Sequence, residues 1–440
     1  MKKSWIVLIA LFVVSVAVAA NVAAQDTALS GVVRVGSWES GDALEHWNTV
    51  IDAYQAANPG VTVELEAVPD NYGTKLLAEL ASGTAPDVFM SGDGDVSKWV
   101  ALGAAENLDP YIDGPNGFDR DSLFPAVAAF GEVNGSTYYL TKDYSPLVIY
   151  YNIDQFNDAG VALPTADWTW ADMVAAAKTL TMDANGNNAD SPDFDPSSIQ
   201  RWGIQMQNTW DRALEPIIYA NGGSMIAADG SSFDGAMNSE ATVNAVQAYS
   251  DLYLVDHVTP TNTDVQSFSG TDLFQSGLVS MLWTGVWPLN GYKDVEGLNF
   301  STVSLPSGSA GNANVLCWSG FALYSGSQNK DAAWDFLKFI ATGDGAAEFA
   351  NYAWTPVVAV ADAQGLSDDP LTSSIVADLA NLQPIPDQLS QYWGECGSAA
   401  FVPALTTILE NGMAVQEAMD SAASTADACL AEKMAEAPAS

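Results

Sequence analysis

Five tryptophans lie in polar or glycine-rich turns that follow apolar runs, where an aromatic ring can face a ligand rather than a core. They are Trp38, Trp210, Trp287, Trp318 and Trp354. Two of them stand directly before a carboxylate, Glu39 and Asp211. A flat indole packs against the C–H surface of a sugar ring, and a planar polar group beside it hydrogen-bonds the ring hydroxyls. These residue types predict a carbohydrate-binding site, with core packing as the alternative for any single tryptophan.

Few residues in this chain could support metal-dependent, catalytic or nucleotide-binding chemistry. The two histidines, His46 and His257, are far apart, so a transition-metal site or a histidine-based catalytic triad is not expected. No phosphate-binding GxxxxGK[ST] motif occurs, which excludes an ATPase of that class. The three cysteines, Cys317, Cys396 and Cys429, permit one disulfide in an oxidising compartment, and the spacing does not choose the pair.

The charge balance excludes polyanions as partners. The 440 residues include 54 Asp or Glu and 14 Lys or Arg, for a net charge of −40. Binding to nucleic acid or anionic lipid needs clustered basic residues, which this chain lacks. A hydrophobic fraction of 48% excludes wholesale disorder and supports two or three domains at this length. Such acidity is also typical of salt-adapted surfaces.

An Asp- and Asn-rich loop is a weaker candidate for a calcium site. Oxygen-bearing side chains recur at alternate positions, as in calcium-binding loops. They are Asp183, Asn185, Asn187 and Asp190. The loop departs from the EF-hand pattern, with Asn188 in place of its glycine and Phe194 in place of its bidentate glutamate. A solvated Asx-rich turn is the alternative, and otherwise no cofactor is expected.

The N-terminal third alternates strand and helix patterns. Strands are predicted at 32–35, 61–65 and 86–90, and helices at 47–54 and 74–81. Further amphipathic helices begin at the Thr169 cap and cover 333–340. This order implies a parallel sheet, whose ligands bind at the carboxyl ends of the strands. Trp38, Glu39 and Asp93 would stand at that edge. Trp47, Trp170 and Trp334 fall on helix faces and are assigned to packing.

Residues 1–24 have the pattern of an export signal. Lys2 and Lys3 precede an apolar run at 5–20, which is short for a membrane span, and small residues follow up to Ala24. No cysteine lies near the cleavage site, so no lipid anchor is expected. The mature protein is predicted in the periplasm or on the extracellular face of a bacterial envelope.

Six groups of motifs, in order, resemble the sugar-binding solute receptors of ABC importers, the family that includes maltose-binding protein. Any single motif is weak evidence, whereas six in the right order are strong. They are WNTVIDAY at 47–54 with NPGVTV at 58–63; LASGTAPDV at 80–88; YYN at 150–152 through Phe156, Gly160, Pro164 and WTW at 168–170; FQSG at 274–277, Met281 and GVW at 285–287; LP at 305–306; and AWDFL at 333–337.

The resemblance implies an α/β chain with the two-lobed periplasmic-binding-protein fold. Each lobe would be a mostly parallel sheet flanked by helices, with the ligand cleft between lobes that close like a hinge. After the signal, the N-terminal lobe would comprise 25–141 and 298–350, and the C-terminal lobe 142–297 and 351–440. The expected partners are a small sugar and an ABC permease, with the protein a monomer.

The same resemblance assigns site residues. Glu39 corresponds to a polar group after the first strand, and Asp93 to a ligand carboxylate, while Asp143 and Tyr144 fall at the first crossover. Trp210, Asp211 and Arg212 precede a helix that begins with Pro216. Arg212 would serve an anionic sugar or simply pair with a neighbouring carboxylate. Trp318, in a loop facing the cleft, replaces a usually small residue and would favour short saccharides.

Two other functions remain as alternatives. Carboxylates and tryptophans also build glycoside hydrolases, but the order of elements does not give eight repeated βα units, and no close carboxylate pair can be placed on facing strands. The third possibility is a receptor of the same fold for a polyol or another non-sugar solute. The sequence favours the non-catalytic sugar receptor.

Overall fold

The computed structural model describes residues 29–92, 95–206, 210–268 and 270–436. Its strands are β1 (Gly31–Ser37), β2 (Val61–Ala67), β3 (Val88–Gly92), β4 (Glu132–Val133), β5 (Ser136–Thr137), β6 (Tyr139–Asn152), β7 (Met182–Asp183), β8 (Ile199–Arg201), β9 (Met281–Gly285), β10 (Phe300–Val303) and β11 (Leu316–Leu323). The predicted export signal lies outside the described residues. Among those residues, no helix is both long enough and apolar enough to cross a membrane.

Helices surround the strands in both halves of the molecule. In the half of the molecule that holds β1 to β3 lie α1 (Ala43–Ala57), α2 (Tyr72–Ser82), α3 (Val96–Ala101), α4 (Asp109–Ile112) and α12 (Lys330–Thr342). Near them along the chain are α5 (Pro125–Ala128), which contacts β6, and α13 (Asp344–Phe349), which contacts α12 and α1. The others are α6 (Ile153–Ala159), α7 (Trp170–Leu180), α8 (Asp211–Ala220), α9 (Glu240–Leu254), α10 (Asn262–Ser267), α11 (Leu289–Lys293), α14 (Val358–Gln364), α15 (Ser373–Asp378), α16 (Pro386–Leu389), α17 (Ala399–Asn411) and α18 (Val415–Glu436).

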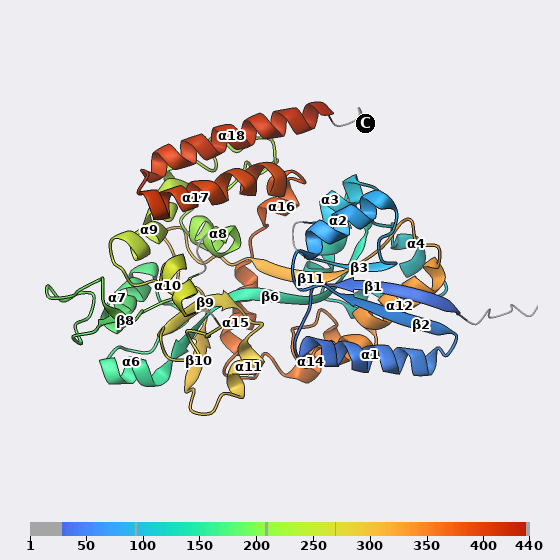
Figure 1. Cartoon of the computed structure of the whole chain (residues 1–440), viewed down its shortest axis with the longest axis horizontal. Helices are drawn as coiled ribbons and strands as arrows, with labels where there is room; N and C mark the ends of the chain where they lie inside the picture. Colours follow the sequence, from blue (N-terminus) through green and yellow to red (C-terminus); the bar gives the residue numbers. More distant parts are fainter. Residues whose placement is uncertain (1–28, 93–94, 207–209, 269, 437–440) are drawn as a thin grey trace, which may run out of the picture.

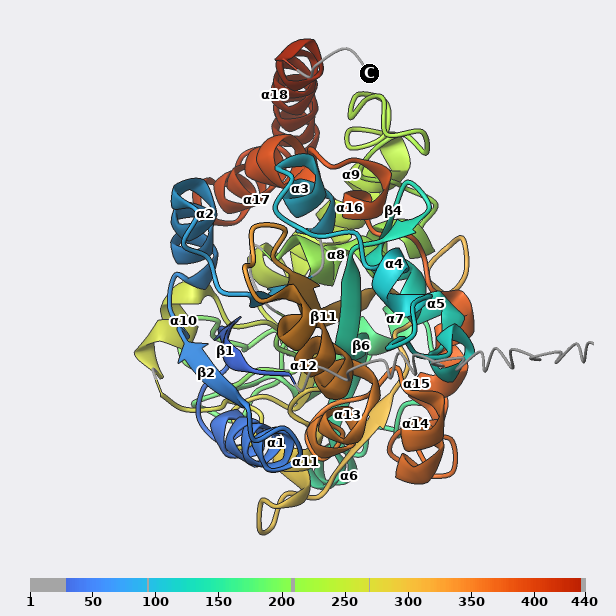
Figure 2. The ribbon, with the colours of Figure 1, turned by 90° about the vertical axis from the view of Figure 1, so that its right-hand side faces the viewer.

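The long strand β6 connects two lobes. Figure 1 shows it crossing the middle of the molecule, from the lobe built on β1, β2 and β3 (the first lobe) to the lobe that holds β9 and β10 (the second lobe). Its first half pairs with β11 and its second half with β9 and β10. Figure 2, viewed along the horizontal axis of Figure 1, shows β6 and β11 side by side. The expected lobe boundary after residue 141 falls inside this strand.

The predicted elements of the N-terminal third are confirmed as β1, α1, β2, α2 and β3. The apolar face of α1 is buried at the predicted positions, including Trp47 and Tyr54, because residues three and four apart share one side of a helix. The predicted cap of α7 is also present. The hydroxyl of Thr169 accepts the backbone N–H of Asp172, whose carboxylate in turn accepts the N–H of Thr169.

The expectation of a mostly parallel sheet is correct only in part. β1 pairs in parallel with β2 and with β3, whereas β11 is antiparallel to β3 and to β6. In the second lobe, β9 and β10 are both antiparallel to β6. The physical reason is that β6 enters this lobe from the first one, running against both neighbours. Parallel bridges are present at β9 and just before it, where Trp202 pairs with Val279 and Gln205 pairs with Leu282.

Two apolar cores fill the molecule: one lies in the second lobe, and the other extends from the first lobe into the second. One disulfide also crosslinks the second lobe. In the first lobe, Trp47 packs edge-on against Phe321 and Phe349. In the second, α17 and α18 pack together along the outer side, as Figure 1 shows. A disulfide joins Cys396 to Cys429 on α18, across 33 positions of sequence. The cysteine pairing that the spacing left open is thus settled.

Candidate functional site

A cavity of about 250 Å³ lies where the end of β1 meets the middle of β6, the start of β11 and the end of β9. We call it the inner compartment. It brings together seven of the eleven predicted site residues from distant parts of the chain. They are Trp38, Glu39, Asp143, Tyr144, Trp287, Trp318 and Trp354. Trp38 and Glu39 directly follow the end of β1, so their place along the sequence was informative, whereas Asp143 and Tyr144 lie within β6.

Aromatic rings dominate the walls of the inner compartment. Trp287 lines the compartment with an indole that is 47% exposed and therefore open to contact from a ligand. A Cβ at Gly285 would overlap the ring of Trp287, so the glycine lets this indole fold back over the end of β9. Tyr144 and Trp354 pack edge to face at 6.0 Å, and the backbone N–H of Tyr144 donates to the Trp354 carbonyl. These contacts hold the aromatic side chains of the compartment in position before any ligand binds.

Trp318 differs from its predicted setting. The sequence placed it in a glycine-rich loop, but it lies in β11, in register with Tyr144 of β6. The ladder is irregular between Ser319 and Gly320, where β11 crosses β6 closely. A Cβ at Gly320 would overlap the carbonyl of Leu140, so close strand packing, rather than a loop, explains this glycine.

A buried cation organises the polar side of the inner compartment. The Lys142 side chain is 1% exposed, and its Nζ lies 2.5 Å from Glu39 Oε1 and 2.7 Å from Asp143 Oδ2. Lys142 also donates to the Tyr352 hydroxyl at 3.0 Å. Burial acts to lower the pKa of Lys142, but the carboxylates of Asp143 and Glu39 hold that pKa well above its ordinary value. Lys142 is thus a permanent positive charge beneath the aromatic walls.

The carboxylate of Glu39 is held by several donors. Besides Lys142, it accepts the Trp47 indole N–H at 2.6 Å and the Tyr352 hydroxyl at 2.9 Å. Burial acts to raise the pKa of Glu39, but Lys142 and these hydrogen bonds outweigh it and lower the pKa below its usual value. A hydrolytic acid must hold a proton at working pH, which requires a raised pKa. Glu39 is suited to orienting a ligand and not to donating a proton.

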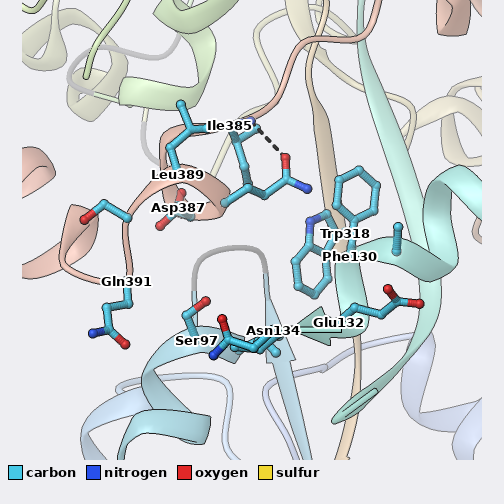
Figure 3. A pocket seen from close by; sticks show the side chains of 14 residues that line it. Ser97, Phe130, Glu132, Asn134, Trp318, Ile385, Asp387, Leu389 and Gln391 are labelled. Carbon is cyan, nitrogen blue, oxygen red and sulfur yellow. Dashed lines mark hydrogen bonds between the residues drawn. The ribbon is translucent and has the colours of Figure 1, made fainter. Parts of the chain in front are cut away.

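A second cavity, of about 480 Å³, lies between the lobes next to the first, and we call it the outer compartment. Residues of the first lobe face the short helix α16 across it, as Figure 3 shows. Its polar lining includes Asn134, Asp387, Gln388 and Gln391. Trp318 lines this cavity as well as the inner one. The two compartments thus adjoin at Trp318, and we refer to them together as the cleft.

The three predicted residues on the second lobe have mixed settings. Trp210 packs edge-on against Trp287, with ring centroids 6.0 Å apart, so it supports the inner compartment from behind. Asp211 accepts the Ser398 hydroxyl at 2.6 Å. Arg212 is buried and binds Glu215 at 2.7 Å and Asp387 at 2.8 Å. This is the carboxylate pairing expected as the alternative to an anionic sugar. α8 begins at Asp211, earlier than predicted.

The remaining predictions concern Asp93 and the Asp-rich loop. Asp93 lies outside the described residues. In the loop, Asp183 is buried, and its carboxylate accepts the backbone N–H groups of Asn185 and Asn187 at 2.8 Å each, with further donors from Asn187 and Asp195. Burial acts to raise the pKa of Asp183, but these donors lower it to about 2. Asp190 is exposed.

Across the described residues, no three His, Cys, Asp or Glu side chains are grouped as a metal site. Calcium binding at Asp183, Asn185, Asn187 and Asp190 stays the less favoured interpretation of this loop, beside the Asx-rich turn.

Sequence reasoning missed Lys142, Tyr352 and the lining of the outer compartment. Lys142 had a usable signal, since a lysine inside an apolar strand of a lysine-poor chain needs a buried partner. Tyr352 stands two residues before Trp354, which was chosen. Gln388 had no signal, because α16 is four residues long and shows no helical periodicity.

Comparisons with known proteins agree with this architecture. Residues 49–404 match the family described as bacterial extracellular solute-binding protein. A binding protein of Brucella abortus is 26% identical over 324 residues, which cover 71% of this chain and 72% of the relative.

Two solved structures share the fold. An ABC substrate-binding protein from Listeria monocytogenes, in complex with cycloalternan, has a TM-score of 0.80 at 22% identity and covers 91% of this chain and 99% of its own. An ABC transporter solute-binding protein from Thermotoga lettingae, bound with α-D-tagatose, has a TM-score of 0.76 at 20% identity and covers 91% and 100%. The fold is thus the two-lobed periplasmic-binding-protein fold.

Proposed function

Because the chain belongs to the bacterial extracellular solute-binding family, we propose that it is a non-catalytic receptor that binds a sugar or short oligosaccharide between its lobes. Its partner would be the permease of an ABC importer, to which it delivers the ligand as a monomer. The predicted lobes, 25–141 with 298–350 and 142–297 with 351–440, would close over the cleft about β6 and the neighbouring crossovers.

The inner compartment carries this proposal. It combines four tryptophans with carboxylate and hydroxyl groups whose positions are already fixed by other contacts. Indole faces match the C–H surfaces of a pyranose, and oriented polar groups match its hydroxyls. The Listeria relative binds cycloalternan and the Thermotoga relative α-D-tagatose, which favours a carbohydrate for this chain too.

Membership of an extracellular family supports export. The pattern of residues 1–24 supports a cleaved export signal. We place the mature receptor in the periplasm or on the extracellular face of the envelope.

A hydrolase is the less favoured alternative. The buried lysine beside Glu39 keeps that carboxylate ionised, which suits binding better than proton donation. A receptor for a polyol or another non-sugar would use the same fold but has less use for so many indole faces.

The test is a thermal-shift and calorimetry screen of the mature protein against neutral sugars, uronates and polyols. A ligand of the folded state adds about 2.7 kcal/mol of stability at a hundredfold excess over Kd. We expect a neutral sugar class to raise the melting temperature and to be recovered intact. New reducing ends after incubation would establish a hydrolase, and shifts with polyols alone would remove the sugar from the proposal.

A further inference from the structure

Trp318 is the aromatic side chain that the inner and outer compartments share. On one side of it lie the indoles of the inner compartment, and on the other the amides and carboxylates of the outer one. A ligand that fills both compartments must therefore pass this residue. Figure 3 shows the Trp318 ring beside Phe130 at the end of the outer compartment, with the α16 residues on one side and Ser97 and Asn134 on the other.

The Trp318 ring is held in place by its neighbours. It stacks on Phe130 with centroids 5.5 Å apart and an interplanar angle of 16°, and it meets Tyr139 edge-on at 5.0 Å. Its backbone belongs to the β6–β11 ladder, next to Tyr144. Such a ring cannot turn aside without disturbing both strands, so it acts as a fixed partition.

The indole N–H of Trp318 gives an independent reason to expect a ligand here. The side chain is 5% exposed, and within the described residues this N–H has no hydrogen-bond acceptor. Buried donors are nearly always paired, so an unpaired one beside two cavities indicates a missing acceptor. A sugar hydroxyl or ring oxygen is an acceptor of the right kind.

The charge of the lining restricts the ligand further. Among the described residues that line either compartment, none is Lys, Arg or His. The nearby cations are already occupied, Lys142 by Glu39 and Asp143, and Arg212 by Glu215 and Asp387. A uronate or a sugar phosphate would place its charge against Asp387 with no cation in the lining to meet it.

We propose that Trp318 sets the minimum length of the ligand, which is an uncharged oligosaccharide of at least two sugar units that spans both compartments. One unit lies among the indoles of the inner compartment. The next crosses Trp318, accepts its N–H, and contacts the amide of Gln388 in the outer compartment. This inference rests on the proposed sugar-binding function and adds to it the ligand's length and charge.

Calorimetry with neutral mono-, di-, tri- and tetrasaccharides of glucose, mannose and galactose tests the length. For the wild type we expect the disaccharide of the preferred sugar to bind at least about tenfold more tightly than its monosaccharide. Trp318→Ala merges the compartments, and we expect this tenfold step to disappear. Trp318→Phe keeps the partition but removes the N–H donor, so part of the step remains.

Two further variants separate the partition from general damage. Gln388→Ala is expected to weaken the disaccharide and longer ligands by about tenfold while changing the monosaccharide by less than about threefold. The matched control is Trp170→Phe, a half-buried indole of α7 that lines neither compartment. In the ¹H–¹⁵N spectrum, the Trp318 indole resonance is identified by its absence from the Trp318→Phe variant. In the wild type, we expect this resonance to shift downfield when the disaccharide binds and to stay in place when the monosaccharide binds.

The outcomes separate this inference from the function beneath it. Absence of binding to any saccharide overturns both. Sugar binding with equal affinities for all lengths, or an equal loss at every length in Trp318→Ala, leaves the receptor and overturns the partition. Equal affinity for a disaccharide that ends in a uronate overturns the requirement for an uncharged ligand.

Discussion

Two buried cations stand on opposite sides of the cleft, and each is shared by two carboxylates. In the first lobe Lys142 holds Glu39 and Asp143, and in the second lobe Arg212 holds Glu215 and Asp387. Both clusters carry one positive and two negative formal charges, and both fix residues that line the cleft. Their composition is nearly the same, but their acid–base behaviour differs.

Burial of the carboxylates accounts for the difference. Glu39 retains partial contact with solvent and several donors, and its pKa is lowered. The Glu215 side chain is fully buried, and this burial, only partly offset by Arg212, raises its pKa to about 8. The same pairing of cation and carboxylate therefore gives a permanent charge in one lobe and a carboxyl that readily takes up a proton in the other.

The largest effect is expected from Lys142→Met. Removing the cation leaves two carboxylates beneath the inner compartment without their counter-charge, which costs about 3–5 kcal/mol in the free energy of unfolding. Urea denaturation at pH 7 measures this. The control is Lys330→Met, which breaks the surface pair with Glu106 and should cost no more than about 1 kcal/mol. Equal losses in the two variants would refute a structural role for the buried lysine.

Arg212→Met should be milder, at about 1–3 kcal/mol near pH 6, because Glu215 can neutralise itself by binding a proton. Urea denaturation of this variant and of Lys142→Met under the same conditions shows which cluster contributes more to the free energy of unfolding. If Arg212→Met proves the more damaging variant at this pH, Glu215 remains charged and the contrast between the clusters is wrong.

The third prediction concerns pH. Between about pH 4.5 and 8 the folded state holds a proton on Glu215 that the unfolded chain releases, so stability from this group falls as pH rises through that window. Glu39, with a lowered pKa, acts in the opposite sense and loses stability only as pH falls below 4.5. Glu215→Gln should therefore flatten the decline from pH 5 to pH 8, a change of about 3 kcal/mol. An unchanged slope would contradict the raised pKa.

The smallest effect is expected at a third buried carboxylate, whose hydrogen bonds come from N–H groups and not from a charged side chain. Asp183 is buried like Glu215, yet N–H donors occupy its oxygens and lower its pKa. We expect EDTA, or added calcium, to leave the melting temperature unchanged. A fall in EDTA that calcium restores would instead establish the predicted site at Asp183, Asn185, Asn187 and Asp190.

Features that depend on local periodicity were predictable. The strands and helices from β1 to β3 follow from alternation and from apolar spacing, and strand ends located Trp38 and Glu39. Partners far apart in sequence were not predictable from such patterns. Lys142 meets Glu39 across 103 positions, and Arg212 meets Asp387 across 175. Asp143 and Tyr144 came from family resemblance, which supplies long-range information that periodicity lacks.

The antiparallel pairing in the second lobe was missed for a related reason. The sequence patterns predicted no strand in this region, whereas a single strand begins at Tyr139, ends at Asn152 and serves both lobes. No local signal states that a strand of this length will change neighbours halfway along. Only the arrangement of β9, β10 and β11 around it determines the direction in which each pairs.

The shared strand also has a consequence for folding. Along β6, Leu147 and Ile149 pack in the core that lies within the second lobe, while Val148 and Tyr150 pack in the core that extends through both lobes. A cut just before Leu147 would separate the half of β6 that pairs with β11 from the half that pairs with β9 and β10. Neither lobe is therefore a self-sufficient folding unit, and the loss of β6 from one core removes side chains from the other. We expect the two lobes to unfold in a single cooperative transition.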